Sequence, residues 1–272
     1  MRINSNMIAR NTYNQLRKND KNAAKNMSKL SSGLRINKAS DDAAGMAVSQ
    51  KMRYQLRGLS QARSNTDSAI SLVNTADGAM DEMTDILQRM RELSVQSSSG
   101  TLSDEDRESV QVEIDQLLEE VTRISDTTEF NSKKLLNGDA EIEGLSMQIG
   151  GKSGQELSIN ISDLSASALD IDDLDVLSES SASSAIEKVD HALSIVNSER
   201  AKIGAYQNRL EYTKNNLNVA HENLTASESV IRDVDMALEM VEYTKNSLLQ
   251  ESATAMLAQA NQQPRRVIEL LK

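Results

Sequence analysis

Apolar residues recur at every seventh position along the C-terminal half of the chain. Seven residues are close to two turns of an α-helix, so these side chains form one stripe along a helix. We call this stripe the heptad ladder; it predicts a helix over roughly 183–240 that packs against other helices along its whole length. Its members are Val189, Val196, Ile203, Leu210, Leu217, Leu224, Ile231 and Leu238.

The neighbours of the ladder indicate what kind of assembly it joins. The positions four residues after ladder members are mostly polar, as at Arg200, Gln207 and Lys214. A two-stranded coiled coil needs a second apolar position in each heptad. The stripe is therefore too narrow for a zipper and indicates one wall of a multi-helix bundle.

The first half of the chain supplies two partner helices. Apolar residues at steps of three and four form one stripe over 59–90 and another over 110–124, as expected for amphipathic helices. Ser103 is expected to cap the second of these helices, with Asp106 completing a capping box. The Ser-Ser-Ser-Gly sequence at 97–100 predicts the turn between them.

The N-terminal region reads as a helix followed by an ordered loop. Residues 1–32 form a helical segment of modest apolarity, and residues 34–44 end in Asp41 and Asp42. We expect these carboxylates to cap the next helix, which runs to about Gln96, because the first N–H groups of a helix lack partners.

The pattern changes after the third helix. Residues 145–161 alternate apolar and polar positions around a Gly-Gly-Lys-Ser-Gly turn, which predicts a β-hairpin. Residues 163–183 are rich in Asp and Ser and connect back to the ladder. A final helix is placed at roughly 227–260, overlapping the end of the ladder, and Pro264 is expected to break it.

These elements predict a mainly α fold: an elongated antiparallel helical bundle or coiled coil with a small β-hairpin region near 140–165. The two ends of the chain carry too few large apolar side chains to offset the entropy lost on ordering. We therefore expect both terminal arms to fold only when they meet a partner.

Composition narrows the function without naming it. The net charge is −11, but residues 1–60 hold 12 Lys and Arg against 3 Asp and Glu, while residues 101–190 hold 6 against 22. No aromatic stacking platform accompanies the basic start, so acidic neighbours explain it better than nucleic acid does. The chain lacks Cys, an apolar signal-peptide core and any run long enough to insert into a membrane.

The sequence offers no chemistry for catalysis, a metal or a cofactor. The two histidines, His191 and His221, lie in the ladder helix about 45 Å apart and cannot share an ion. Thr225 stands where a zinc-protease motif beginning at His221 would need its second His. We therefore expect a protein that is not an enzyme.

Long strings near both ends resemble those of bacterial flagellin. The N-terminal string is Leu30-Ser-Ser-Gly-Leu-Arg-Ile-Asn37 followed by Asp41-Asp-Ala-Ala-Gly45. The C-terminal strings include Ile231-Arg-Asp-Val-Asp-Met236 and Ala255-Met-Leu-Ala-Gln-Ala-Asn-Gln-Gln-Pro264. The resemblance covers nearly the whole chain. It implies a short form that lacks the outer variable domains of the family, since only about residues 137–180 lie where they would be inserted.

The resemblance implies an extracellular subunit of the bacterial flagellum that is exported unfolded, polymerises with copies of itself at the distal tip and serves motility. It implies as partners an export chaperone, the secretion apparatus, the filament cap and the hook–filament junction proteins. Residues 1–42 and 235–272 would form the inner filament domain, and 43–234 the rod-like bundle. The assembly arms would act through Ile3, Met7, Leu16, Met256, Leu257, Ile268 and Leu271.

The resemblance also implies a contact with the vertebrate innate flagellin receptor, which some flagellins make. The matching positions are Arg89, Leu93, Gln96 and Glu113, whereas Leu117 replaces a basic residue of those flagellins. Two alternatives remain open at this point: a hook–filament junction protein, which has related terminal segments, and a soluble coiled-coil scaffold, which would explain the heptads alone.

Overall fold

The structure is a computed structural model that describes residues 6–139 and 144–270, with side chains described up to residue 263. It forms two compact units. One combines the chain up to Leu56 with the chain from Glu222 onward, and the other runs from Arg57 to His221. Long helices packed antiparallel and two small two-stranded sheets make up the fold, so the predicted mainly α class is confirmed.

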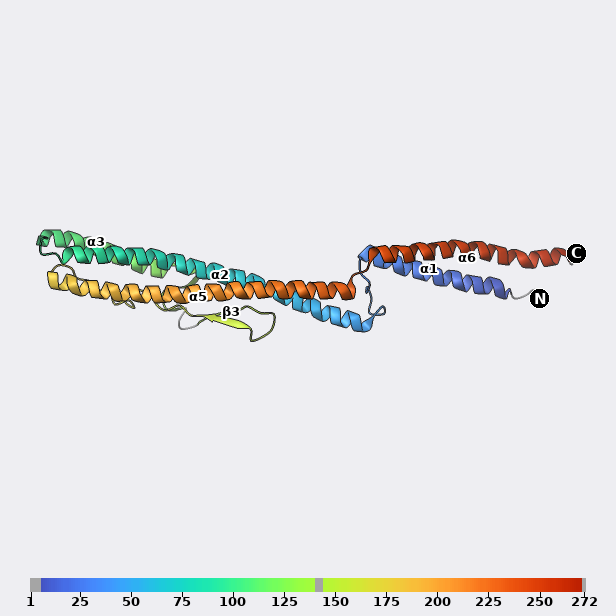
Figure 1. Cartoon of the computed structure of the whole chain (residues 1–272), viewed down its shortest axis with the longest axis horizontal. Helices are drawn as coiled ribbons and strands as arrows, with labels where there is room; N and C mark the ends of the chain where they lie inside the picture. The colour runs from blue at the N-terminus through green and yellow to red at the C-terminus, as the bar shows by residue number, and fades with distance from the viewer. Residues whose placement is uncertain (1–5, 140–143, 271–272) are drawn as a thin grey trace. The chain divides into compact units, whose positions relative to one another are not determined.

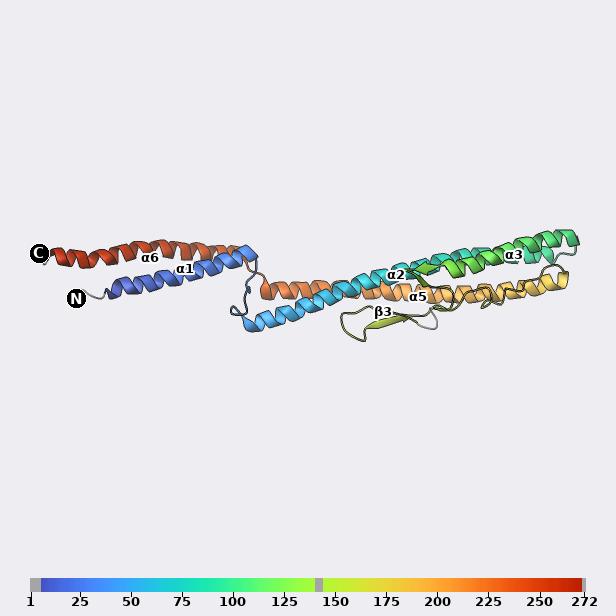
Figure 2. The same ribbon diagram turned by 180° about the vertical axis from the view of Figure 1, so that it is seen from behind.

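Helices α1 (Met7–Ser32) and α6 (Met236–Leu270) pair in the first unit. They lie side by side in both views (Figures 1 and 2). Asn6 caps α1 by accepting a hydrogen bond from the N–H of Ala9, 3.0 Å away. Gly33 ends α1 in the left-handed conformation, with φ of 69°, which glycine adopts without steric cost.

The loop after α1 is tied to the end of the ladder helix. Leu34 and Asp233 form an antiparallel bridge, flanked by hydrogen bonds from the N–H of Arg35 to the carbonyl of Arg232 and from the N–H of Val234 to the carbonyl of Gly33. The two chain segments that lead into the α1/α6 pair are therefore fixed to each other.

The predicted cap of the long second helix is confirmed for Asp42. Helix α2 (Ala43–Ser97) begins directly after Asp42, whose carboxylate accepts a hydrogen bond from the N–H of Gly45 at 2.9 Å. Asp41 instead accepts from the N–H groups of Asn37 and Lys38 and orders the loop before the helix.

Helix α2 packs antiparallel to α5 (Glu179–Arg232) in the second unit, and ion pairs mark their register. Asp67 pairs with Lys214 at 2.8 Å, and Arg91 pairs with Asp190 at 2.6 Å. Both pairs have residue numbers that add to the same total, so the two helices stay in register over many turns. Helix α3 (Asp104–Thr127) completes the bundle, and its capping box between Ser103 and Asp106 is confirmed.

Two hairpins follow α3. The predicted one is confirmed: β3 (Leu145–Gln148) pairs antiparallel with β4 (Glu156–Ile159). A shorter one, β1 (Glu129–Phe130) with β2 (Lys133–Lys134), was not predicted. Asn131 and Ser132 join its strands with φ values of 52° and 62°, the positive values that tight hairpin turns require.

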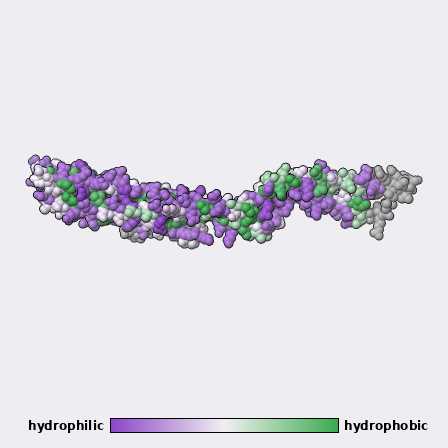
Figure 3. All heavy atoms as spheres, in the orientation of Figure 1, coloured by the Kyte–Doolittle hydropathy of each residue, from purple (hydrophilic) through white to green (hydrophobic). Residues whose placement is uncertain are grey.

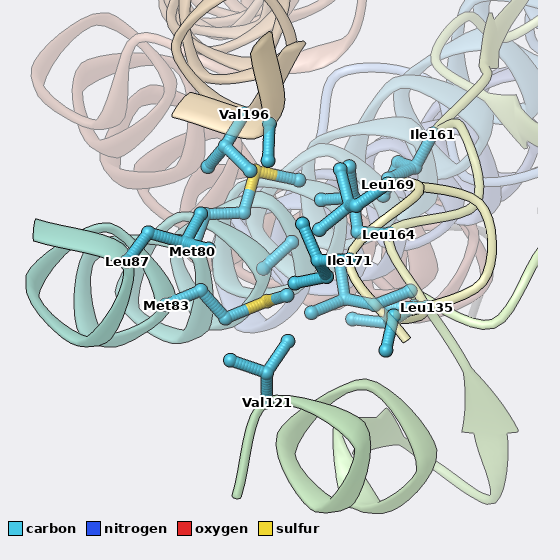
Figure 4. Packing of buried hydrophobic residues seen from close by; sticks show 14 of the residues in the cluster. Met80, Met83, Leu87, Val121, Leu135, Ile161, Leu164, Leu169, Ile171 and Val196 are labelled. Carbon is cyan, nitrogen blue, oxygen red and sulfur yellow. The ribbon is translucent and has the colours of Figure 1, made fainter. Parts of the chain in front are cut away.

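The core of the second unit joins the three helices to the segment between β4 and α5. Met80, Met83 and Leu87 of α2 are fully buried, and Figure 4 shows the side chain of Met83 extending toward Ile171 of this segment. That segment is more than the polar connection its Asp and Ser content predicts, because apolar side chains spaced by two or three residues enter the core. They are Leu164, Ala166, Leu169, Ile171, Leu174 and Val176.

Three predicted helix boundaries are wrong. The ladder helix does not reach residue 240, because α5 ends at Arg232 and Asp235 caps a new helix by accepting from the N–H groups of Ala237 and Leu238. The final helix therefore begins at Met236 and not near 227. It also continues through Pro264 to Leu270, where a break was expected.

Candidate assembly surface

The fully buried positions of the α1/α6 seam, meaning the contact between these two helices, hold small and polar side chains. The buried residues of α1 in the described chain are Asn19 and Asn26. On α6 the buried positions follow a heptad spacing: Glu239, Asn246, Ala253 and Ala260. Large apolar side chains normally fill such positions, so this pair of helices gains little from hydrophobic burial within the chain.

Hydrogen bonds connect the polar residues of the seam. With its amide oriented so that both polar atoms have partners, Asn26 accepts from Nδ2 of Asn246 at 3.1 Å and donates to Oε1 of Glu239 at 3.0 Å. Lys29 donates to Oε2 of Glu239 at 3.2 Å. We call these four residues the polar layer. Their mutual bonds meet the requirement that buried polar groups be paired.

Most of the large apolar side chains described on α1 and α6 are exposed instead. Leu238, Val241 and Leu248 are between 59% and 67% exposed, and Figure 3 shows green apolar patches over this pair of helices. Among the side chains that the structure describes, the other exposed large apolar residues of the two helices are Met7, Ile8, Tyr13, Met27, Met236, Met240, Leu249 and Met256.

A groove on α6 lies within this apolar surface. It is a shallow, open depression of about 400 Å³, lined by Met240, Val241, Thr244, Lys245 and Leu248. An extended apolar surface of this kind usually marks a contact with another protein. Because the seam is polar and the exterior apolar, the α1/α6 pair has the distribution expected of helices whose main partners lie outside the chain.

The residues predicted for the assembly arms fall at different places on these helices. Met7 and Met256 are 59% and 62% exposed, whereas Leu16 and Leu257 are partly buried. Ile268 lies in α6, where side chains are not described. Ile3 and Leu271 lie outside the described residues.

The heptad ladder occupies the buried face of α5 over its first five members. Val189, Val196, Ile203, Leu210 and Leu217 are buried, and Leu224 and Ile231 are partly buried. Leu238 is 65% exposed, so its inclusion in the ladder is wrong. The break before α6 shifts the buried position by one residue, from Leu238 to Glu239.

The residues matched to the innate receptor contact lie on α2 and α3. Arg89 bonds to Glu113 at 2.9 Å and to Glu92 at 3.3 Å, and these hydrogen bonds, the first above all, raise the pKa of Arg89. Gln96 is exposed, but Leu93 is only 2% exposed. Leu93 therefore packs in the core and presents almost no surface to a partner.

Sequence reasoning missed the polar seam. Apolar stripes predict buried helix faces, and Glu239, Asn246, Ala253 and Ala260 do not form such a stripe. Their seven-residue spacing was nevertheless visible in the sequence. Asn19 and Asn26 repeat at the same spacing on α1, so a search for small and polar heptads would have found the seam.

The His, Asp and Glu residues that the structure describes form no group of three or more that could hold a metal ion. Within the same residues, no helix is long and apolar enough to cross a membrane.

Comparison with known proteins accounts for nearly the whole sequence. Residues 3–141 match the family described as the bacterial flagellin N-terminal helical region, and residues 186–271 match the bacterial flagellin C-terminal helical region. The chain is 49% identical to a flagellin of Bacillus subtilis over 304 residues and 47% identical to a flagellar filament 33 kDa core protein of Treponema phagedenis over 286 residues. Each match covers all of both chains.

Solved structures agree with this assignment. The crystal structure of a Bacillus cereus flagellin is 31% identical, with a TM-score of 0.52 over 57% of this chain and 88% of that one. A putative flagellar hook-associated protein of Vibrio parahaemolyticus gives a TM-score of 0.60 over 71% of this chain and 99% of that one. Its identity is 12%, so that likeness concerns the fold alone.

Both terminal regions match the flagellin descriptions, and only residues 142–185 fall between the two matches. The relatives at nearly half identity are filament proteins, which separates this chain from the junction-protein and scaffold alternatives. The chain therefore belongs to the bacterial flagellin family and is a structural subunit of the extracellular flagellar filament, not an enzyme.

Proposed function

We propose that the apolar exterior of the α1/α6 pair drives polymerisation of this flagellin by packing against the same helices of neighbouring copies. A helical filament needs two different complementary surfaces on each subunit, because the contact must repeat without closing into a ring. In this proposal, residues 1–42 and 235–272 form the inner filament domain, and residues 43–234 form the bundle outside it.

The observation that supports this proposal most strongly is that the α1/α6 seam is polar while the apolar side chains lie on the exterior of the pair. Asn26, Glu239 and Asn246 occupy the contact within the chain, while Leu238, Val241 and Leu248 face outward. Burying a large apolar side chain contributes about 1.5–3 kcal/mol. Contacts with other copies that cover this surface would therefore stabilise both the filament and the two arms.

The same apolar surface also supports a role for partner proteins that bind the subunit before it assembles. An exposed apolar pair of helices promotes aggregation in the cytoplasm, so an export chaperone that covers α6 fits this role. The secretion apparatus, filament cap and hook–filament junction proteins follow as further partners of a subunit that is exported and added at the distal tip.

Recognition by the vertebrate innate receptor is a second proposed role, limited to the surface around Arg89 and Glu113. Arg89 and Gln96 are exposed and Glu113 is partly exposed, whereas Leu93 is buried. In a receptor assay with monomers we expect Arg89→Ala to weaken activation and Leu93→Ala to act only through loss of stability. Equal activation by Arg89→Ala and the unchanged chain would contradict this role.

Serine substitutions on α6 test the polymerisation proposal. Changing Leu238, Val241 and Leu248 together to serine removes apolar contact area without touching the buried seam. We expect the variant to remain monomeric under conditions in which the unchanged chain forms long filaments, as seen by electron microscopy and sedimentation.

A matched variant controls for serine in a helix. Glu251, Asn261 and Gln262 are exposed polar residues of the same helix, and their replacement by serine is expected to leave polymerisation intact. Circular dichroism should show both variants folded. Filament growth by the first variant at the rate of the second would contradict the proposal.

A further inference from the structure

The polar layer is an unusual way to join two helices. Lys29 and Glu239 have side chains that are 20% and 8% exposed, and Asn26 and Asn246 are each 8% exposed. Replacing such groups with well-packed apolar residues often leaves stability unchanged or raises it. The polar layer therefore need not make the α1/α6 pair more stable. Its more important effect is to restrict which residues of α1 can lie opposite which residues of α6.

The heptad spacing gives the pair several alternative alignments. Seven residues from Asn26 and Asn246, in opposite directions along the two helices, lie Asn19 and Ala253, which are also buried. Sliding one helix by seven residues would keep the seam positions in the seam. Small residues such as Ala253 and Ala260 would not oppose such a slide sterically.

These alignments differ in free energy because they pair the polar side chains differently. In the observed register, Asn26 bonds to Asn246 and to Glu239. A slide by one heptad would put Ala253 in the place of Asn246 and Asn246 in the place of Glu239, so Asn26 would lose one amide partner, and both Asn26 and Lys29 would lose the carboxylate of Glu239. An unpaired buried polar group costs about 1–3 kcal/mol, so the slipped alignments are disfavoured even though their apolar contacts are similar.

Charge also opposes the pairing of identical helices from different copies. Helix α1 carries 6 Lys and Arg and 1 Asp. Two α1 helices in contact would bring like charges together, whereas α6 supplies Glu239 to Lys29. Repulsion of this kind contributes to specificity by destabilising wrong pairings.

We propose that Lys29, Asn26, Glu239 and Asn246 determine the specificity of assembly by fixing the register of α1 against α6. This inference rests on the proposed polymerisation through the exterior of the pair. A fixed register sets which apolar residues of α1 lie beside those of α6, and every copy then presents the same surface to its neighbours. A buried polar pair that fixes the register of a coiled coil acts in the same way.

Cysteine pairs report the register, because the chain has no cysteine of its own. The variant Asn19→Cys with Ala253→Cys reports the observed register. The variant Asn19→Cys with Ala260→Cys reports a slide of one heptad. Oxidation by an added oxidant forms an intramolecular disulfide in the full-length chain, which is measured by gel mobility and mass after filament assembly.

With the polar layer intact, we expect the first reporter to cross-link in high yield and the second only in traces. In the Asn26→Leu and Asn246→Leu background, the second reporter should cross-link to an extent comparable with the first. A control background carries Asn14→Leu and Ser252→Leu at exposed positions of the same helices. In it, both reporters should cross-link with the yields seen when the polar layer is intact. Unchanged yields in the Asn26→Leu and Asn246→Leu background would overturn the inference.

A second measurement covers the case in which the leucine variant does not assemble. Hydrogen exchange of α6 in the monomer should be faster in each single variant, Asn26→Leu or Asn246→Leu, and should recover in the double variant. Additive losses would contradict a coupled pair. Failure of the unchanged chain to form filaments would count against the proposed function, whereas the monomer cross-links would still report the register.

Discussion

The side-chain amide of Asn6 donates a hydrogen bond to the backbone carbonyl of Ala260 at 2.8 Å. In an α-helix that carbonyl accepts from the N–H four residues later, which here belongs to Pro264. Proline has no N–H, so the carbonyl of Ala260 lacks its usual donor. Asn6 supplies one from α1 and caps its own helix with the oxygen of the same side chain.

This relationship predicts that substitutions at positions 6 and 264 compensate for each other. Asn6→Asp keeps the cap but loses the donor to Ala260, and we expect it to destabilise the α1/α6 pair by about 0.5–1.5 kcal/mol. Pro264→Ala provides an N–H within α6 and should reduce that loss. Native-state hydrogen exchange of α6 in filaments measures both effects, and equal losses with and without Pro264→Ala would refute the pairing.

The heptad ladder predicts a contrast within α5. Leu210 is fully buried, so Leu210→Ala should destabilise the bundle by about 2–5 kcal/mol. Lys214 forms a half-exposed ion pair with Asp67, and Lys214→Ala should cost at most about 1 kcal/mol. Thermal unfolding of the full chain compares the two variants. A similar drop in melting temperature for both would show that the ladder does not mark the core.

The sequence predicts the fold correctly where apolar residues recur with the period of a helix and are buried. The stripes through Met80 and Leu210 are apolar, and both residues are fully buried. It fails where the contact is polar, as at Asn26 and Asn246, because a buried amide looks like a surface residue in the sequence. It also fails at Pro264, whose place in α6 depends on a donor from a distant part of the chain.

The loop before α2 predicts a pH dependence. Hydrogen bonds to the carboxylate, the largest effect coming from the N–H of Lys38 and the next from the side chain of Lys25, lower the pKa of Asp41 below its ordinary 3.8. A lowered folded pKa means that this stabilisation is present above pH 3.8 and is lost as the pH falls through the folded value. Titration of Asp41 followed by NMR should give a midpoint below pH 3.8. In the Asp41→Asn variant, the stability of this loop should no longer change with pH in that range. A midpoint at 3.8 or above would contradict the bonding described.

The polar seam predicts that the two arms are the least stable part of the monomer. Small and polar contacts along α1 and α6 supply little hydrophobic stabilisation, so local opening should need less free energy there than in the bundle. Limited proteolysis of monomers should remove both arms and leave a resistant core near 45–235. The same treatment of filaments should leave the arms intact, and equal resistance of arms and core in the monomer would argue against this view.

Accessibility of Leu248 tests the central claim most directly. Leu248 is 59% exposed on α6, and a Leu248→Cys variant carries a single thiol because the chain has no other cysteine. Maleimide labelling is compared in monomers, in filaments and in filaments dissolved with denaturant. Polymerisation through the exterior of the α1/α6 pair predicts rapid labelling of monomers, strong protection in filaments and full labelling after dissolution. Labelling of intact filaments as fast as of monomers would contradict the account.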